Sequence, residues 1–293
     1  MNLRGVRFAP SPTGIFHVGN LRTAWVASCL AKELGEPLVI RIEDIDVARV
    51  RADAWPSQSE DLKQIRVTSD ITQKQTDHFA RHLELFETAR REGRVYPCDC
   101  SRRDVLLRLA EMTSAPHAAE PEYSGHCRHR HETLKTYRPK ETLAWRWKST
   151  DASGVHDAIV ARTGPDGSSF APGYHWACAI DDADGAYHVL VRAWDLAPAD
   201  DIQKEIREWV SSGRTAPVVF HTSLVTQNDG QRLEKRSRGV TLAELLSKGT
   251  SIATLINNFE SNFDLPSALN AIRNPQRPAG ELQRSVTLSQ LSI

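Results

Sequence analysis

The first 42 residues read as a strand, a tight turn, a helix and a second strand, and this order constrains the fold more than any other part of the chain. Residues 6–9 have strand character, and the Pro/Gly-rich residues 10–14 form a turn. Apolar residues at near-helical spacing begin near Asn20, and Gly35 ends that helix. The apolar run at 38–42 is typical of a strand buried on both faces of a parallel sheet. We therefore predict a right-handed βαβ unit in an α/β fold.

Composition narrows the class of protein further. The 293 residues include 37 Lys+Arg and 37 Asp+Glu, so the net charge is zero and any nucleic-acid contact must be local. No apolar run approaches the ~18 residues of a membrane span, and the start of the chain lacks the apolar stretch of a secretory signal. We therefore expect a cytoplasmic protein with no membrane partner. Five cysteines, an odd number, favour reduced thiols or metal ligands over a disulfide framework.

Weaker patterns predict the later elements. A second amphipathic helix, ended by Gly93, is predicted from apolar residues at helical spacing, namely Phe79, Leu83, Phe86 and Ala89. Strand character returns in three short runs, at 144–147, 188–191 and 218–220. Thr241 and Glu244 fit a capping box that opens a helix. From about Pro275 the sequence has no clear period, and we expect it to be loosely ordered.

The start of the first helix is a candidate phosphate-binding site. The chain contains neither a Walker-type glycine loop nor a GxGxxG motif, so a bound nucleotide needs another device. A helix N-terminus offers N–H groups and partial positive charge, His17 can donate to a phosphate oxygen, and Gly19 lets a flat base approach the backbone. For an isolated His-x-Gly, a solvated surface loop remains the more common interpretation.

The segment from 96 to 131 holds three of the cysteines and is a candidate metal site. Cys98 and Cys100, with Cys127 about 27 residues further on, can form a tetrahedral zinc site if one more donor is found. Spacing alone leaves buried free thiols as an equal alternative, and several histidines compete as the fourth ligand: His117, His126, His129 and His131. Cys29 and Cys178 lie in apolar contexts and are interpreted as core residues.

Three strings together resemble one enzyme family. PSPTG, followed by His-x-Gly-Asn and Leu-Arg-Thr-Ala, resembles the HIGH signature region of class I glutamyl-tRNA synthetases and their short relatives. RIEDIDVAR at 41–49 resembles the block after the second strand, where Glu43, Asp44 and Asp46 would lie at the ligand-binding edge of the sheet. RLEKR at 232–236 aligns with the family's Lys-rich loop. The resemblance implies a doubly wound, Rossmann-like catalytic domain over 1–240 with a zinc-bearing insertion at about 96–131, then a short helical segment over 241–293.

The resemblance also implies an ATP site. Its residues are His17, Gly19, Asn20, Arg232, Lys235 and Arg236, of which the first three and Lys235 form the catalytic set. Lys235 is expected to neutralise charge that develops on the phosphates during adenylate formation, and Mg²⁺ is expected to accompany ATP. Arg232 and Glu234 depart from the family's KLSKR form, and the Glu234 carboxylate is repulsive towards triphosphate.

A glutamate site and a zinc ligand set follow from the same resemblance. The implied glutamate-binding residues are Arg7, Phe8, Ala9, Pro10, Ser11, Glu43, Tyr174 and Arg192. Arginines pair bidentately with carboxylates, Glu43 can take the substrate ammonium, and Tyr174 adds a hydroxyl and an aromatic wall. Ala193 stands where the family usually has glycine and is expected to crowd the backbone. The order Cys-x-Cys, Tyr-x-x-x-Cys implies a structural zinc held by Cys98, Cys100, Tyr123 and Cys127.

Length distinguishes between members of the family. Only about 50 residues follow the capping box, too few for a helical anticodon-binding domain. The resemblance to the short relatives implies a monomer that activates L-glutamate with ATP and transfers it to queuosine at the wobble position of tRNA(Asp). Two alternatives stay open. One is a minimal synthetase that charges a tRNA 3′ end. The other is a catalytically silent, zinc-bearing tRNA-binding paralogue, an alternative that Glu234 and Ala193 keep open.

Overall fold

The structure is a computed structural model that describes residues 5–101, 103–105, 123, 125–129, 142–150, 156–165, 169–211, 213, 215–231, 240–275, 279–281 and 283–293. It divides into two compact units, which are described separately. The first comprises Met1–Asp77, Gly185–Asp200 and Arg214–Ile293, and the second comprises His78–Asp184 and Asp201–Gly213, as far as these ranges are described. Within the described ranges, no helix combines the length and hydropathy that crossing a membrane requires.

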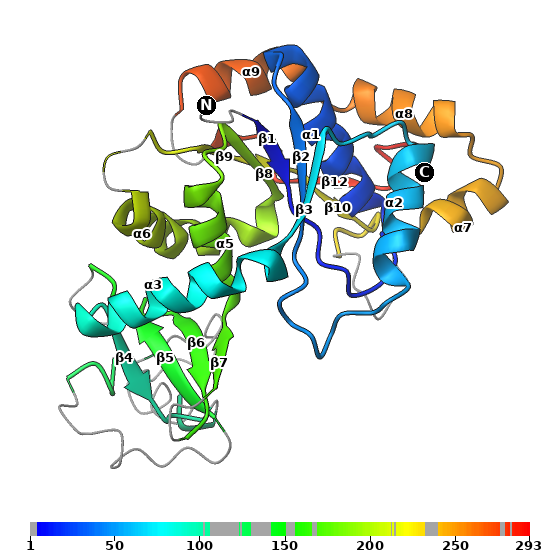
Figure 1. Cartoon of the computed structure of the whole chain (residues 1–293). Helices are drawn as coiled ribbons and strands as arrows, with labels where there is room; N and C mark the ends of the chain where they lie inside the picture. Colours follow the sequence, from blue (N-terminus) through cyan, green and yellow to red (C-terminus); the bar gives the residue numbers. More distant parts are fainter. Residues whose placement is uncertain are drawn as a thin grey trace. The chain divides into compact units, whose positions relative to one another are not determined.

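A parallel sheet forms the centre of the first unit (Figure 1). Its order, over the described strands, is β11-β9-β8-β1-β2-β3, and every neighbouring pair is parallel. The strands are β1 (Val6–Phe8), β2 (Leu38–Ile42), β3 (Ile71–Lys74), β8 (Val189–Ala193), β9 (Val218–Thr222) and β11 (Ala279–Gly280). In the register, Phe8 of β1 lies opposite Ile40 of β2 and Val191 of β8. The predicted α/β fold with a parallel sheet, and the strands predicted at 188–191 and 218–220, are confirmed.

Helix α1 (Val18–Leu34) connects β1 to β2 and completes the predicted βαβ unit. It begins two residues before the predicted start, because His17 caps it. The His17 ring Nδ1 accepts from the Gly19 amide at 3.1 Å, and Asn20 Oδ1 accepts from the His17 amide at 3.3 Å. A reciprocal capping box of this kind satisfies two donors of the first turn. Gly35, with a φ of 65°, ends the helix as predicted.

The core of the first unit lies between α1 and one face of the sheet. Leu21, Val26 and Leu30 of α1 are fully buried in one cluster with the side chains of β1, β2, β8 and β9. The same cluster includes residues from α2 (Ala54–Gln64), α7 (Leu242–Ser247), α8 (Ile252–Ser261) and α9 (Leu265–Arg273). Trp25 packs against Phe259, with ring centroids 5.9 Å apart. The predicted helical segment after residue 240 is therefore an integral part of the first unit.

The prediction of a loosely ordered C-terminal end is wrong for residues 279–281 and 283–293. β11 extends the parallel sheet, and β12 (Ser285–Thr287) pairs with β10 (Leu224–Thr226). Glu281 forms a buried bidentate ion pair with Arg22 of α1, with oxygen–nitrogen distances of 2.6 and 2.7 Å. These strands are only two or three residues long, so they produce no periodic pattern, and the ion pair that holds them is non-local.

Glu281→Ala is expected to lower the free energy of unfolding by about 3–5 kcal/mol. The reason is that Arg22, only 1% exposed, would keep a buried charge without its carboxylate. Urea unfolding followed by tryptophan fluorescence measures the change. Glu60→Ala is the matched control, because Glu60 is exposed and its carboxylate lies 4.0 Å from Lys63, so a change within about 0.5 kcal/mol is expected. Equal stability of the two variants would contradict the role given to the ion pair.

The second unit contains an antiparallel sheet of order β4-β5-β6-β7 (Figure 1). Its strands are β4 (Val95–Cys98), β5 (Leu143–Trp147), β6 (Ile159–Thr163) and β7 (Phe170–Pro172). Its described helices include α3 (Phe79–Arg91), α5 (Tyr174–Asp184) and α6 (Asp200–Ser211), of which only Asp200 belongs to the first unit. Short 3-10 turns cover Gln75–His78 and Trp194–Ala199, and all of their residues except His78 belong to the first unit. The strand predicted at 144–147 is confirmed as β5.

Helix α3 lies where the sequence predicts a helix, but two of the four residues predicted on its buried face are exposed. Phe79 and Leu83 are 41% and 37% exposed. Phe86 and Ala89 are buried as predicted, and His82 and Leu85 are the other buried residues of this helix. The predicted face missed His82 because histidine is polar, yet its ring Nε2 lies 2.7 Å from the buried Asp181 carboxylate. A satisfied hydrogen bond lets this polar residue occupy a core position.

Candidate active site and metal centre

The first turn of α1 lies against the chain that precedes α7. The Val18 amide donates to the Val240 carbonyl at 2.8 Å, and His17 forms an isolated antiparallel bridge with Thr241. Because His17 Nδ1 accepts from the Gly19 amide, the neutral ring carries its proton on Nε2, the atom that can donate to a phosphate. A Cβ on Gly19 would lie 3.0 Å from two atoms of the His17 ring. Glycine at this position therefore leaves room for the histidine ring.

The basic string RLEKR lies outside the described residues, so Arg232, Glu234, Lys235 and Arg236 are not placed. The described chain ends before it at Gln231 and resumes at Val240. Thr241 then opens α7 with the predicted capping box, in which its hydroxyl accepts from the Glu244 amide at 3.2 Å. The segment that carries the basic string thus rejoins described structure directly beside His17.

The acidic residues after β2 lie at the carboxyl edge of the sheet, as predicted. Glu43 donates its amide to the Pro10 carbonyl at 2.9 Å, which ties it to the turn at 10–14, and its carboxylate accepts from Arg41 at 3.2 Å. Asp44 instead accepts from the amide and hydroxyl of Thr76, both at 2.9 Å. Asp46 pairs with Arg49 on the surface. Of the three, Glu43 is the residue whose backbone is hydrogen-bonded to the 10–14 turn.

Three buried arginines share one face of the parallel sheet. Arg7, Arg41 and Arg192 are 4%, 0% and 4% exposed. Side chains alternate along a strand, and all three arginines have the parity of Val39 and Leu190, which pack together on the face opposite α1. The sequence predicts Arg7 and Arg192 as glutamate-binding residues but does not predict Arg41. The available signal was a charged residue inside the otherwise apolar run LVIRI.

Arg192 is held at the end of β8 by polar contacts. Its Nη1 lies 3.4 Å from Asp200 Oδ1, and Asp200 Oδ2 lies 2.7 Å from Nε2 of the fully buried His221. The His221 ring stacks on Trp194 with centroids 4.7 Å apart. Ala193 has a φ of −79°, which any residue adopts, so its backbone conformation does not require the family's glycine.

The other predicted glutamate-binding residues have different surroundings. Phe8 packs into the α1 core, so its side chain lies on the face opposite Arg7. The turn from Pro10 through Ser11 is held by Gln58 of α2, whose amide donates to the Ser11 carbonyl at 3.1 Å and to the Gly14 carbonyl at 2.7 Å. Gln58 is buried, and sequence reasoning did not identify it. Ala9 continues β1 into this turn, and Tyr174 opens α5 in the second unit, 42% exposed.

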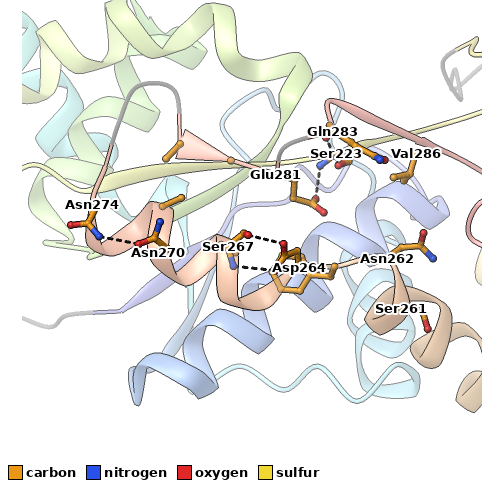
Figure 2. Close-up of a pocket in the computed structure, with 15 residues that line it drawn as sticks. Ser223, Ser261, Asn262, Asp264, Ser267, Asn270, Asn274, Glu281, Gln283 and Val286 are labelled. Carbon is orange, nitrogen blue, oxygen red and sulfur yellow. Dashed lines mark hydrogen bonds between the residues drawn. The ribbon is translucent and has the colours of Figure 1, made fainter.

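A cavity of about 730 Å³ in the first unit lies beside α9 and the C-terminal strands (Figure 2). Some of its polar side chains pair with one another: Asp264 accepts from the Ser267 hydroxyl at 2.6 Å, and Asn274 donates to Asn270 at 3.0 Å. Glu281, which also lines it, is bound by Arg22. The residues that line this cavity include none of the predicted site residues.

Three cysteines of the second unit form a cluster suited to a metal ion. The sulfurs of Cys98, Cys100 and Cys127 all lie within 4.8 Å of one another, and those of Cys100 and Cys127 are 3.6 Å apart. Thiolates bound tetrahedrally to zinc at about 2.3 Å lie ~3.8 Å apart. The sulfur positions therefore fit zinc.

The Tyr123 hydroxyl lies beside the cysteine cluster, where it could serve as a fourth donor. This hydroxyl lies 3.8 Å from Cys98 Sγ and accepts from the Cys127 amide at 2.7 Å, and the Tyr123 side chain is buried. His126 and His129 are exposed, and neither belongs to the cysteine cluster. His117 and His131 lie outside the described residues.

The three thiols of the cluster influence one another's pKa values. Hydrogen bonds from Cys100 and Cys127, together with the charge of Arg146, hold the pKa of Cys98 well below its usual value. Hydrogen bonds with Cys127 and Cys98, reinforced by burial, raise the pKa of Cys100. Three sulfurs this close can all be thiolates only around a cation, because like charges repel.

The two remaining cysteines have no part in the cluster. Burial raises the pKa of Cys29 to about 12, and Cys178 is buried in α5. Both are free thiols, in agreement with the prediction of core residues.

Comparison with known proteins places this geometry in a family. Residues 5–260 match the family described as tRNA synthetases class I (E and Q), catalytic domain. The chain is 33% identical to a glutamyl-Q tRNA(Asp) synthetase of Deinococcus radiodurans over 89% of each chain. It is 35% identical to a protein of the same name from Cutibacterium acnes, over 83% of this chain and 71% of the relative.

A solved structure shares the fold. The glutamate tRNA ligase of Elizabethkingia meningosepticum superposes with a TM-score of 0.67 at 22% identity, over 88% of this chain. This chain spans 60% of the length of that one. The parallel sheet and the capped first helix are consistent with the family match over residues 5–260. The chain therefore belongs to the ligase family of class I tRNA synthetases (E and Q), whose catalytic domain it carries.

Proposed function

We propose that this protein activates L-glutamate with ATP and transfers the glutamyl group to queuosine at the wobble position of tRNA(Asp). The observation that carries the proposal is the set of buried arginines Arg7, Arg41 and Arg192 on one sheet face, with Glu43 at its carboxyl edge. Glutamate has two carboxylates and one ammonium group, which match guanidinium groups and a carboxylate respectively. Ligands of open α/β sheets bind at this edge. Tyr174 is proposed to supply a further hydroxyl.

The first step is adenylate formation. A glutamate α-carboxylate oxygen attacks the α-phosphorus of ATP, the bond from that phosphorus to the bridging oxygen breaks, and pyrophosphate leaves with the electron pair. His17 Nε2 and the amides of Gly19 and Asn20 are proposed to contact the phosphates. Arg232, Lys235 and Arg236 are proposed to stabilise the charge on the leaving pyrophosphate, and Mg²⁺ to offset the charge of ATP.

The second step is acyl transfer to the tRNA. A hydroxyl oxygen of the queuosine ring attacks the carbonyl carbon of glutamyl-adenylate, AMP leaves, and the hydroxyl proton passes to solvent. The names of the Deinococcus and Cutibacterium relatives support this acceptor, because the chain aligns with most of each relative's length. We further propose that the protein acts as a cytoplasmic monomer.

The zinc-bearing insertion is proposed to be structural. Cys98, Cys100, Cys127 and Tyr123 would hold the ion, which would crosslink β4 to the segment at 123–129. With these four protein donors no position would stay open for a substrate, so a bound ion would supply folding free energy and take no part in the reaction.

Glutamate-dependent ATP–pyrophosphate exchange, with and without tRNA, tests the activation step. We expect exchange with glutamate in at least one condition, and its absence in both would favour a silent tRNA-binding paralogue. Transfer is tested with labelled glutamate on tRNA(Asp) prepared with and without queuosine. We expect labelling only of the queuosine-containing tRNA. Labelling that persists on the queuosine-free tRNA would favour a minimal synthetase that charges the 3′ end.

A further inference from the structure

Arg146 of β5 contacts two of the proposed zinc ligands at once. Its guanidinium carbon lies 3.5 Å from the centroid of the Tyr123 ring, and its Nε donates to Cys98 Sγ at 3.3 Å. The side chain is only 7% exposed. A guanidinium over an aromatic face at this distance is a cation–π contact, and it is strongest when desolvated. Arg146 therefore restrains both the ring that carries the oxygen donor and one of the three sulfurs.

The backbone of Asp157 also binds the guanidinium group of Arg146. Arg146 Nη1 donates to the backbone carbonyl of Asp157 at 2.6 Å. The Asp157 carboxylate is almost fully buried and accepts from the Tyr96 hydroxyl at 2.6 Å, from Arg128 at 2.7 Å and from the Ser149 amide at 2.8 Å. Because several donors fix Asp157, the carbonyl that orients Arg146 is fixed as well.

Charge explains why a guanidinium suits this position. A buried cation needs nearby negative charge, and the Asp157 carboxylate is already paired with Arg128. A zinc ion with three thiolates has a net formal charge of −1, opposite to that of Arg146. The contacts of Arg146 with the Cys98 sulfur and the electron-rich face of Tyr123 place its charge against that cluster.

We propose that Arg146 is a positioning residue of the metal centre, which holds Cys98 and Tyr123 in ligand geometry and balances the charge of the zinc–thiolate cluster. The proposal rests on the zinc site proposed above. Partners of this kind around metal ligands typically change metal affinity by about 10- to 100-fold when they are replaced.

The test compares zinc affinity in full-length variants by competition with a chromogenic chelator. We expect Arg146→Gln to weaken zinc binding about 10- to 100-fold. Arg146→Lys should recover part of the loss, because lysine keeps the charge but lacks the planar group and the Nε donor. Arg207→Gln is the matched control, since Arg207 is a 6% exposed arginine of the same unit and lies in α6, outside the cysteine cluster. An equal loss in both glutamine variants would indicate general destabilisation and overturn the proposal.

Cobalt substitution gives a readout that general destabilisation does not move. In the wild-type protein we expect thiolate-to-cobalt charge-transfer bands, and in Arg146→Gln a changed d–d spectrum, because Tyr123 is no longer restrained. An unchanged spectrum and unchanged affinity in that variant would leave the zinc site intact and overturn only the role of Arg146. A wild-type protein that binds neither metal would instead overturn the zinc site itself. If Arg146→Gln does not fold, Arg146→Lys supplies the same comparison, and wild-type affinity in it would overturn the proposal.

Discussion

Lys235→Ala is expected to slow glutamate-dependent ATP–pyrophosphate exchange by about 10²- to 10³-fold. In the proposed mechanism the lysine ammonium meets charge that develops on the phosphates only as pyrophosphate leaves. Its removal should therefore lower kcat and kcat/KM together, with little change in the KM for glutamate. Among the described residues, Val240 and Thr241 follow the basic string in the sequence and contact the start of α1 at Val18 and His17.

Lys63→Ala is the control for that measurement. Lys63 is 70% exposed on α2 of the first unit, and its ammonium lies 4.0 Å from Glu60, so its removal should leave exchange and stability unchanged. Thermal unfolding should be the same for both lysine variants and the wild type. An exchange rate of Lys235→Ala equal to that of Lys63→Ala would remove Lys235 from the catalytic set.

Cys98→Ser is expected to release most of the zinc and to destabilise the second unit. Structural zinc contributes roughly 10–16 kcal/mol of apparent binding free energy in small zinc domains, and a serine hydroxyl is a poor replacement for a thiolate. A loss of only about 3 kcal/mol would lower the melting temperature on the order of 10 °C in a unit of this size. Elemental analysis of the purified protein measures the metal, and differential scanning calorimetry measures the transition.

Cys29→Ser provides the comparison for Cys98→Ser. Cys29 lies in α1 of the first unit and is not part of the cysteine cluster. Burial raises the pKa of its thiol to about 12, so the thiol stays protonated near neutral pH. We expect this variant to retain full zinc. Full metal occupancy in Cys98→Ser as well would place the zinc at other residues.

Local signals explain what the sequence predicts well about the fold. The βαβ unit follows from adjacent residues: an apolar strand, a Pro/Gly turn, a helix ended by Gly35 and a second apolar strand. The Thr241–Glu244 capping box is equally local. The strands after Pro275 escaped prediction because Arg22 and Glu281, which fix them, are 259 positions apart. No pattern along the chain records such a partner.

In the candidate site, too, the sequence predicts some residues and not others. Arg7, Glu43 and Arg192 are identified because their strings resemble a family, and the cluster of Cys98, Cys100 and Cys127 follows from ligand chemistry and spacing. Gln58 and Arg146 act through contacts with carbonyls, a sulfur and a ring that only the fold brings to them. Residues that support a site rather than form it have no signature of their own in a single sequence.

The ion pair between Arg22 and Glu281 also bears on the order in which a newly made chain folds. During synthesis Arg22 leaves the ribosome long before residue 281 does, so α1 cannot reach its final state until the last strand of the parallel sheet is made. The second unit contains no residue beyond Gly213, so it can fold while the first unit is still incomplete. We therefore expect the second unit, with its cysteine cluster, to become resistant to proteolysis on ribosome-bound chains before the unit that would bind ATP.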